Sequence, residues 1–369
     1  MKYLFINSVA GYGSTGHIIE NTARGLMQDG HQCAIAYGRH LVNCDGITLY
    51  RIGSKLDVAL HGAKTRLFDA EGFGSKAATR KLVKWIDTYQ PDVIWLHNLH
   101  GYYINVEVLF GYLKSHPDIQ VKWTLHDCWT MTGHCAHFMT IDCNQWMDGC
   151  TSCQLLGDYP KCIGLSNVSK NYARKKAAFT GVKNIEIIVP CKWMGSVVEQ
   201  SYLREYPARV VYNTIDLQQF RPIEIDTEEK ICPEKKIILG VASVWNHKKG
   251  LDDFIKLDTM IDHDRYQIVL VGLNKQQLSA LPASITGLER TNSTLELAKL
   301  YTEAFVYLNL TYEDNYPTTN LEAQACGTPC ITYNTGGSPE SVPADNVIEK
   351  GDLKSVITRI EELFTCATK

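Results

Sequence analysis

The sequence predicts an α/β fold made of two doubly wound, Rossmann-like domains that face each other across a cleft. Short runs of β-branched and aromatic residues alternate with amphipathic helical patterns, which is typical of parallel sheets covered by helices. A chain of 369 residues is long enough for two domains with separate cores. The alternation starts afresh after about residue 206. We therefore place the domains at 1–205 and 206–351, with a closing helix, 352–369, that is free to pack back on the first domain.

The individual elements follow from their apolar patterns. The first domain opens with an apolar strand at 3–7, a glycine-rich turn, and a helix over about 17–28 that Gly30 ends. Its further strands are predicted at 33–37, 92–96, 121–125 and 186–190. Strands of the second domain are predicted at 209–212, 236–241, 267–272, 306–310 and 330–333. The closing helix presents one apolar face, formed by Leu353, Val356, Ile357, Ile360 and Phe364.

Composition excludes several classes of protein. With 45% hydrophobic and 21% charged residues, the chain has the composition of a soluble globular protein. No window reaches the roughly 18 uninterrupted apolar residues that a membrane span needs. The N-terminal apolar run turns polar at Asn7, so it lacks the core of a signal peptide. We therefore expect a cytoplasmic protein.

The net charge of −3 hides an asymmetry between the domains. Residues 1–205 hold 21 Lys and Arg against 17 Asp and Glu, whereas residues 206–369 hold 16 against 23. The cations gather at Lys76, Arg80 and Lys84, in helical spacing, and between residues 161 and 183, where no acid occurs. Such faces suit a diphosphate or an anionic membrane surface that the protein would join peripherally, but a solvated helix explains them equally well. Nucleic acid is not expected, because the chain as a whole is acidic and carries no binding motif.

The most informative stretch runs from Tyr312 to Pro329. It follows a predicted strand and leads into a short helix that Thr318 or Thr319 can cap and that Gly327 ends. The amides at the start of this helix form a natural phosphate site. Glu322 is placed to accept hydrogen bonds from ribose hydroxyls, although it could instead simply stabilise the helix dipole.

This stretch resembles the signature of the family 4 nucleotide-sugar glycosyltransferases, retaining enzymes with the two-lobed GT-B fold. Their pattern is an acid, seven residues, a Glu, and then Ala-x-Ala-Cys-Gly-Thr-Pro. Here Asp314 and Glu322 stand at the two acid positions, and 323–329 matches the rest. Four further stretches agree with motifs of the family in the same order: 213–222, 248–251, 296–301 and 336–340.

The resemblance implies a nucleoside-diphosphate sugar as donor and no catalytic metal or other cofactor. The donor-binding residues that it implies are Gly13, Ser14, Thr15, Gly16, Ser243, Lys249, Asp314, Asn315, Tyr316, Pro317, Thr318, Thr319 and Glu322. The glycine-rich turn, taken alone, is equally well an ordinary tight turn. The chain departs from the family at Val244, where an arginine often helps bind the diphosphate. Glu313 also lies nine residues before Glu322, so either Glu313 or Asp314 can take the role of the first acid.

Polar side chains follow two strands of the first domain. His97, Asn98 and His100 come after one strand, and His126 and Asp127 after another. Such clusters at strand ends favour contact with a substrate over packing in the core. The resemblance implies that His126 touches the transferred sugar. The catalytic candidates are His126, Asp127, Asp314 and Lys249, and the acceptor-binding candidates are His97, Asn98, His100 and Trp129.

Residues 128–165 form an insertion with little regular pattern that holds six of the 13 cysteines. A loop of this length is usually functional or stapled. Four thiolates can form a closed, structural zinc site, with His134 and His137 as substitute ligands. The candidate zinc ligands are Cys135, Cys143, Cys150 and Cys153. Unlinked buried thiols and disulfides are the alternatives. The candidate sugar platforms of the insertion are Trp129, Phe138 and Trp146.

These observations predict a retaining glycosyltransferase, of the hexosyl- or N-acetylhexosaminyl-transferase class, that uses UDP or another nucleoside-diphosphate sugar. We expect a glycan acceptor, lipid-linked, in bacterial surface polysaccharide synthesis, as in the similar enzymes of capsule, O-antigen or colanic-acid assembly. One alternative is an epimerase or phosphorylase of the same fold. Another is a zinc-stapled glycan-binding module without turnover. The base, the sugar, the acceptor, the linkage and the oligomeric state depend on details that the sequence leaves open.

Overall fold

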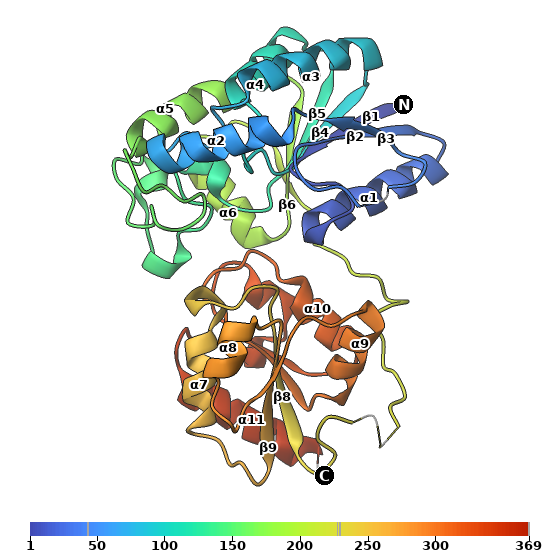
Figure 1. Cartoon of the computed structure of the whole chain (residues 1–369), viewed down its shortest axis with the longest axis vertical. Helices are drawn as coiled ribbons and strands as arrows, with labels where there is room; N and C mark the ends of the chain where they lie inside the picture. The colour runs from blue at the N-terminus through green and yellow to red at the C-terminus, as the bar shows by residue number, and fades with distance from the viewer. Residues whose placement is uncertain (43, 227, 229, 368–369) are drawn as a thin grey trace. The chain divides into compact units, whose positions relative to one another are not determined.

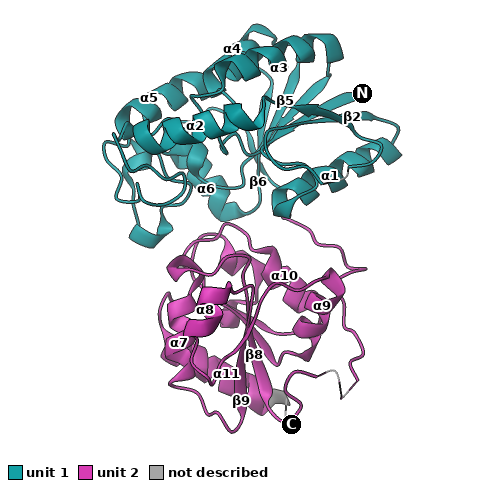
Figure 2. Ribbon diagram, viewed as in Figure 1, with its two compact units in different colours: residues 1–211 teal, residues 212–369 magenta. Residues whose placement is uncertain are grey.

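The computed structural model describes residues 1–42, 44–226, 228 and 230–367. The chain divides into two compact units, Met1–Val211 and Tyr212–Lys369 (Figure 2). Each unit has its own parallel sheet, as the alternating strand and helix patterns predict. Across the described residues, every helix is too short or too polar to cross a membrane.

The first unit holds a seven-stranded parallel sheet in the order β3-β2-β1-β4-β5-β6-β7, with helices on both of its faces (Figure 1). The strands are β1 (Lys2–Asn7), β2 (Gln32–Tyr37), β3 (Thr48–Arg51), β4 (Val93–Leu96), β5 (Gln120–Thr124), β6 (Ile185–Val189) and β7 (Ala208–Val210). The helices are α1 (Gly13–Gln28), α2 (Lys55–Phe68), α3 (Lys76–Tyr89), α4 (Val106–Ser115), α5 (Val168–Phe179) and α6 (Lys192–Gln200). Three short 3-10 helices lie in the cysteine-rich insertion: η1 (Trp129–Met131), η2 (Met139–Ile141) and η3 (Gln145–Met147).

The strand order places a reversal between β1 and β4. From β1 the sheet grows to β2 and β3 on one side, and through β4 to β7 on the other. Doubly wound sheets bind ligands beyond the carboxyl ends of their strands at such a reversal. The glycine-rich turn follows β1 and His97 follows β4, so both predicted features lie at this position.

Two boundaries differ from the sequence prediction. The strand at 208–210 pairs with β6 as the last strand of the first sheet, so the first unit ends at Val211 and not at 205. All three of its side chains are exposed, so the sequence has no alternation of apolar residues that would predict the sheet to which this strand belongs. Helix α1 begins at Gly13, which makes the second half of the predicted glycine-rich turn the first turn of the helix.

The second unit holds a six-stranded parallel sheet in the order β10-β9-β8-β11-β12-β13. The strands are β8 (Lys236–Val241), β9 (Tyr266–Val271), β10 (Thr286–Leu288), β11 (Val306–Asn309), β12 (Cys330–Tyr333) and β13 (Val347–Ile348). The helices are α7 (Leu251–Asp258), α8 (Lys275–Ala280), α9 (Thr294–Glu303), α10 (Thr318–Ala325) and α11 (Leu353–Ala367), with 3-10 turns η5 (His247–Lys249), η6 (Ser338–Ser341) and η7 (Ala344–Asn346). Here the reversal lies between β8 and β11, which are paired neighbours. The loop after β8 and the segment after β11 therefore leave the sheet side by side.

The closing helix belongs to the second unit. Helix α11 packs Leu353, Val356 and Ile360 into a core that contains Ile238 of β8 and Leu308 of β11. This confirms the predicted apolar face. It also corrects the expectation that the helix packs back on the first domain, because the face is already occupied within its own unit.

Candidate active site

The loop after β8 ends in η5, and Asn246 caps that short helix. Its Oδ1 accepts a hydrogen bond of 3.0 Å from the backbone N–H of Lys249. Gly250 follows with a φ of +76°, and a Cβ there would lie 2.2 Å from the carbonyl oxygen of Leu310. A residue with a side chain would collide with that backbone. Glycine thus allows η5 to lie against the segment that follows β11.

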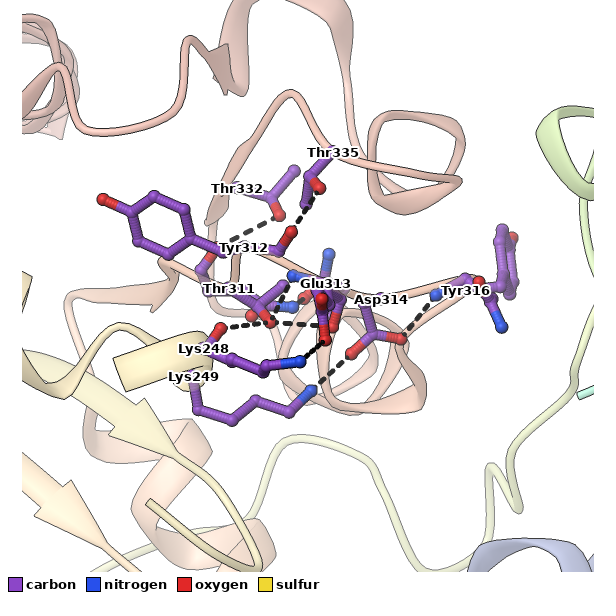
Figure 3. Close-up of polar contacts among 12 residues, drawn as sticks. Lys248, Lys249, Thr311, Tyr312, Glu313, Asp314, Tyr316, Thr332 and Thr335 are labelled. Atoms are coloured by element: carbon purple, nitrogen blue, oxygen red, sulfur yellow. Dashed lines mark hydrogen bonds and ion pairs between the residues drawn. The ribbon is translucent and has the colours of Figure 1, made fainter. Parts of the chain in front are cut away.

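Two lysines meet two acids at this point, as Figure 3 shows. The Nζ of Lys248 donates to Glu313 Oε2 at 2.8 Å, and the Nζ of Lys249 donates to Asp314 Oδ2 at 2.8 Å. The Glu313 side chain is 4% exposed and that of Asp314 is 23% exposed. Each acid therefore has its own lysine, and the Lys249–Asp314 pair is the one more open to a ligand.

Hydrogen bonds hold the acidic segment in place (Figure 3). The carbonyl oxygen of Lys248 accepts from the backbone N–H of Tyr312 at 2.8 Å and from the Thr311 hydroxyl at 3.2 Å. The Tyr312 hydroxyl donates to Asp253 Oδ2 at 2.7 Å, and the Tyr333 hydroxyl donates to the same oxygen at 2.8 Å. The start of the segment is thus tied both to the lysine loop and to α7, which fixes the two acids that follow it before any ligand binds.

Helix α10 follows the acidic segment and carries Glu322. The helix begins at Thr318, and Pro317, whose side chain cannot accept a hydrogen bond, occupies the N-cap position. The prediction that Thr318 or Thr319 caps this helix was therefore wrong. Glu322 Oε2 accepts a hydrogen bond of 3.1 Å from the Tyr301 hydroxyl. Burial raises the pKa of Glu322, while the hydrogen bonds from Tyr301 and Thr318 oppose that change.

Two buried asparagines that the sequence analysis did not single out anchor α10. Asn309, at the end of β11, donates through Nδ2 to Asn320 Oδ1 at 2.8 Å. Asn320 Nδ2 in turn donates to the hydroxyl of Ser341, in η6, at 2.9 Å. Both asparagines were hidden within apolar or motif-rich runs, and only the packing reveals that they pair. They position α10, and with it Glu322, relative to the sheet.

The predicted donor residues fall in both units. The structure brings Lys249 and Asp314 into contact and places Glu322 on the helix into which residues 315–317 lead. Ser243 lies in an exposed bend of the loop after β8. Gly13–Gly16 form the first turn of α1 in the first unit.

The predicted histidine clusters of the first unit form one polar group. His97 Nδ1 lies 2.9 Å from His126 Nε2, and the two rings stack with centroids 5.2 Å apart. His100 Nε2 lies 2.6 Å from Asp127 Oδ2, and its Nδ1 lies 2.8 Å from the hydroxyl of Tyr159. Tyr159 belongs to the cysteine-rich insertion and carries no sequence signal for this role. The insertion thus contributes a side chain to the cluster.

The environment divides these groups into a neutral pair and a charged pair. Burial, with His126 beside it, holds the pKa of His97 well below its ordinary value, and burial lowers the pKa of His126 to about 4. Burial also acts on His100 and Asp127, but their mutual attraction outweighs it, raising the pKa of His100 and lowering that of Asp127. Asn98, half-buried, stands between the two histidines that follow β4. The cluster therefore combines two histidines that favour the neutral form with a histidine and a carboxylate that stabilise each other's charge.

The neutral histidine predicts a loss of stability in mild acid. His126 takes up a proton near its ordinary pKa of about 6.5 in the unfolded chain, but only near pH 4 in the folded one. Between these values the unfolded chain binds more protons, so stability falls as the pH falls from 6.5 to 4. We expect the melting temperature, followed by circular dichroism, to fall by several degrees across this window, and less in His126→Gln.

The control for this measurement is His263→Gln. His263 is a half-exposed histidine of the second unit, with 43% of its side chain accessible. This variant should keep the full acid-dependent loss of the native protein. Equal slopes for the native protein and His126→Gln would contradict the buried neutral state of His126.

The predicted aromatic platforms are buried. Trp129 is 0% exposed and its ring lies 3.6 Å from the Nζ of Lys175. Phe138 and Trp146 are also buried and stack on one another with centroids 4.9 Å apart. The assignment of Trp129 to acceptor binding, and of the other two rings to sugar stacking, was therefore wrong. In a segment of loops and short 3-10 helices, no periodicity in the sequence separates inward from outward side chains.

Lys175 is a buried cation that the sequence placed on the surface. Its Nζ donates to the carbonyl oxygens of Trp129 at 2.7 Å and Thr132 at 3.1 Å, and burial lowers its pKa to about 7. Its neighbour Arg174 is paired with Glu107 at 2.7 Å. These two residues do not belong to the predicted basic surface. Lys175 instead holds the start of the cysteine-rich insertion against α5.

The cysteines of the insertion gather without forming a metal site. Cys135 and Cys153 are hydrogen-bonded, which lowers the pKa of the Cys153 thiol, and Cys143 lines the same cavity of about 190 Å³. In the described part of the chain, no three Cys, His, Asp or Glu side chains are arranged to hold a metal ion. The predicted zinc ligands, which include Cys150, do not fit a metal as they lie. Metal analysis of the purified protein decides between zinc and free thiols.

The chain is similar in sequence to known sugar-transferring proteins. Residues 223–369 match the family described as glycosyl transferases group 1. Over 298 residues the chain is 26% identical to the putative colanic acid biosynthesis glycosyl transferase WcaC of Escherichia coli (strain K12), covering 79% of this chain and 70% of that protein. Over 143 residues it is 27% identical to the N,N'-diacetylbacillosaminyl-diphospho-undecaprenol alpha-1,3-N-acetylgalactosaminyltransferase of Campylobacter jejuni, covering 35% of this chain and 36% of that protein.

The structure also resembles a solved complex. HepE of Anabaena, in complex with UDP, matches with a TM-score of 0.65 at 13% identity, covering 100% of this chain and 90% of that one. A likeness at this level of identity establishes the fold. The predicted GT-B architecture is thereby confirmed.

Proposed function

We propose that the chain is a retaining glycosyltransferase that uses a nucleoside-diphosphate sugar, because residues 223–369 match the glycosyl transferases group 1 family and the fold is GT-B. The observation that carries the proposal is the group at the reversal between β8 and β11. There the accessible Lys249–Asp314 pair lies ahead of the helix that bears Glu322. A cation, a carboxylate and the N-terminal amides of a helix at one strand edge suit a diphosphate, a sugar and a ribose.

We assign one role to each of these groups. Glu322, oriented by hydrogen bonds from Tyr301 and Thr318, accepts further hydrogen bonds from the ribose hydroxyls. Asp314 and the backbone N–H groups of Thr318 and Thr319, in the first turn of α10, bind hydroxyls of the sugar. Lys249 stabilises the charge that develops on the diphosphate as the sugar leaves, which is the largest contribution to catalysis that this site can make.

The polar cluster of the first unit is proposed to contact the acceptor and the transferred sugar. His126 is held neutral by burial, so it can accept or donate one hydrogen bond without adding a charge. The His100–Asp127 pair keeps a carboxylate at the same strand ends. In a retaining reaction the acceptor attacks on the face that the leaving diphosphate vacates, and a phosphate oxygen can take the acceptor's proton. These residues then orient the acceptor and need not act as a base.

A lipid-linked glycan is the acceptor class we propose. The relative from Campylobacter jejuni is named for an undecaprenol diphosphate acceptor, and the one from Escherichia coli for colanic acid biosynthesis. The excess of cations over acids in residues 1–205 is compatible with work beside an anionic membrane. We therefore place the reaction in bacterial surface polysaccharide synthesis, at the cytoplasmic face of a membrane.

The test is nucleotide release that depends on an acceptor. UDP- and GDP-sugars are incubated with the protein, with and without a synthetic undecaprenyl-diphosphate-linked sugar, and released nucleotide and product anomer are measured. Acceptor-dependent release with the donor's anomeric configuration retained is expected. A changed sugar without acceptor would instead identify an epimerase. Binding without any turnover would favour the glycan-binding module.

A further inference from the structure

Helix α2 in the first unit buries its polar side and exposes leucines to solvent. Its buried residues are His61, Gly62 and Thr65, whereas Leu56 and Leu60 are 66% and 61% exposed. Figure 1 shows α2 on the face of the first unit turned toward the viewer. A surface helix normally buries its apolar side. Here the two leucines, one helical turn apart, form an apolar stripe in solvent.

Hydrogen bonds fix the polar side of α2 inward. His61 Nε2 accepts from the backbone N–H of Gly74 at 3.0 Å, and its Nδ1 lies 3.0 Å from the Ser75 hydroxyl. Thr65 donates to Glu71 at 3.4 Å. Rolling the helix to hide its leucines would break these buried contacts, so the apolar stripe is part of the folded state.

A second segment extends the stripe. The backbone N–H of Ile163 donates to the carbonyl of Arg66 at 2.8 Å, and that of Leu165 to the carbonyl of Leu67 at 2.8 Å. Ile163 and Leu165 are 71% and 68% exposed. We call the combined surface the apolar patch; its members are Leu56, Leu60, Leu67, Phe68, Ile163 and Leu165. Contiguous exposed apolar surface of this kind marks an interaction site.

The charges beside the apolar patch are positive. The exposed cations are Lys55, Lys64 and Arg66 on α2 and Lys161 just before the second segment. The acid of α2, Asp57, is occupied by a capping box with Ser54. A symmetric pairing of two copies through this surface would bring like charges together. Apolar side chains flanked by cations instead match the interface of an anionic bilayer, where the apolar groups enter the acyl boundary and the cations meet headgroups.

We propose that the apolar patch docks the first unit on an anionic lipid bilayer. This deepens the proposed function, on which it rests for its biological purpose, because a lipid-linked acceptor is presented at such a surface. The docking itself needs no sugar transfer. Binding to lipid and binding of nucleotide can therefore be measured separately.

The experiment is co-sedimentation of the full chain with vesicles of phosphatidylethanolamine and phosphatidylglycerol, and with vesicles of phosphatidylcholine alone. The native protein should sediment with the anionic vesicles. Leu60→Asp/Ile163→Asp should weaken this binding at least about tenfold, since each change removes an apolar contact and adds a repelled charge. Lys64→Glu/Arg66→Glu should weaken it at low salt and remove most of its salt dependence.

Leu295→Asp is the matched control, because Leu295 is 58% exposed on α9 of the second unit and should leave lipid binding unchanged. All variants should keep their nucleotide affinity, which separates a failure of docking from a failure of the proposed function. The proposal is overturned if the native protein stays in solution with anionic vesicles or if the patch variants bind like it. It is equally overturned if ultracentrifugation without lipid finds a dimer that the patch variants dissociate.

Discussion

Replacing Glu322 by alanine is expected to reduce the affinity for the donor nucleotide by roughly a hundredfold or more. A carboxylate can accept about four hydrogen bonds, so Glu322 can accept from ribose hydroxyls besides those from Tyr301 and Thr318. A hydrogen bond to a charged group contributes about 1.5–3 kcal/mol. Isothermal titration calorimetry with UDP and with GDP measures the loss. The nucleotide that binds the native protein tightly also names the base of the donor.

Two further variants show whether the loss is specific. Tyr301→Phe removes the hydroxyl that orients Glu322 but leaves the carboxylate, so it should weaken binding by less than about tenfold. Glu362→Ala removes a half-exposed acid of α11 and should have no effect. If Glu322→Ala bound nucleotide as tightly as the native protein, the ribose role would be lost. If neither UDP nor GDP bound the native protein, the donor site itself would be misplaced.

Lys249→Ala is expected to lower the rate of sugar transfer by about a hundred- to a thousandfold. Removing one preorganised group that stabilises developing charge typically costs this much. The Nζ of Lys249 is already held by Asp314 at 2.8 Å, so the cation is in place before the donor arrives. Initial rates of nucleotide release at saturating donor measure the effect, because the loss should appear in kcat more than in KM.

The neighbouring lysine provides a contrast. Lys248→Ala leaves Glu313, with only 4% of its side chain exposed, without the ion pair, so it should lower the melting temperature as well as the rate. Lys249→Ala exposes a more accessible acid and should melt close to the native protein. Lys354→Ala, an exposed lysine of α11, should match the native protein in both measurements. A rate for Lys249→Ala within a few-fold of native would remove this residue from the diphosphate.

The position of the lysines and acids of the second unit was largely predictable from the sequence. Strands β8 and β11 are apolar runs of β-branched and aromatic residues, and the lysines and acids lie in the loops that follow them. Once two such strands are adjacent in a parallel sheet, their trailing residues must meet. The sequence did not reveal which acid pairs with which lysine. That depends on the contact between Gly250 and the backbone of Leu310, which no local pattern records.

The first unit was less predictable where regular structure is missing. The insertion at 128–165 has no period, so Trp129 was taken for a surface ring. Lys175, on helix α5, was taken for a surface charge, although it and Trp129 cover each other in the interior. Helix α2 misleads in the opposite way. Its leucines recur with helical spacing but are exposed, because buried hydrogen bonds of His61 and Thr65 hold the opposite side of the helix inward. In both places long-range polar contacts outweigh the apolar pattern.

The paired lysines also determine how a nucleotide reaches the second unit. Each cation of the site is already neutralised by an acid, and residues 212–369 hold 15 Lys and Arg against 23 Asp and Glu. The unit therefore presents no long-range positive field that could draw an anionic donor through solution. The proposed donor would then be captured by random encounter, and on this proposal a phosphate oxygen replaces Asp314 on Lys249 only after contact. Binding would thus replace one short-range ion pair of Lys249 by another. The association rate would depend on the donor concentration much more than on ionic strength.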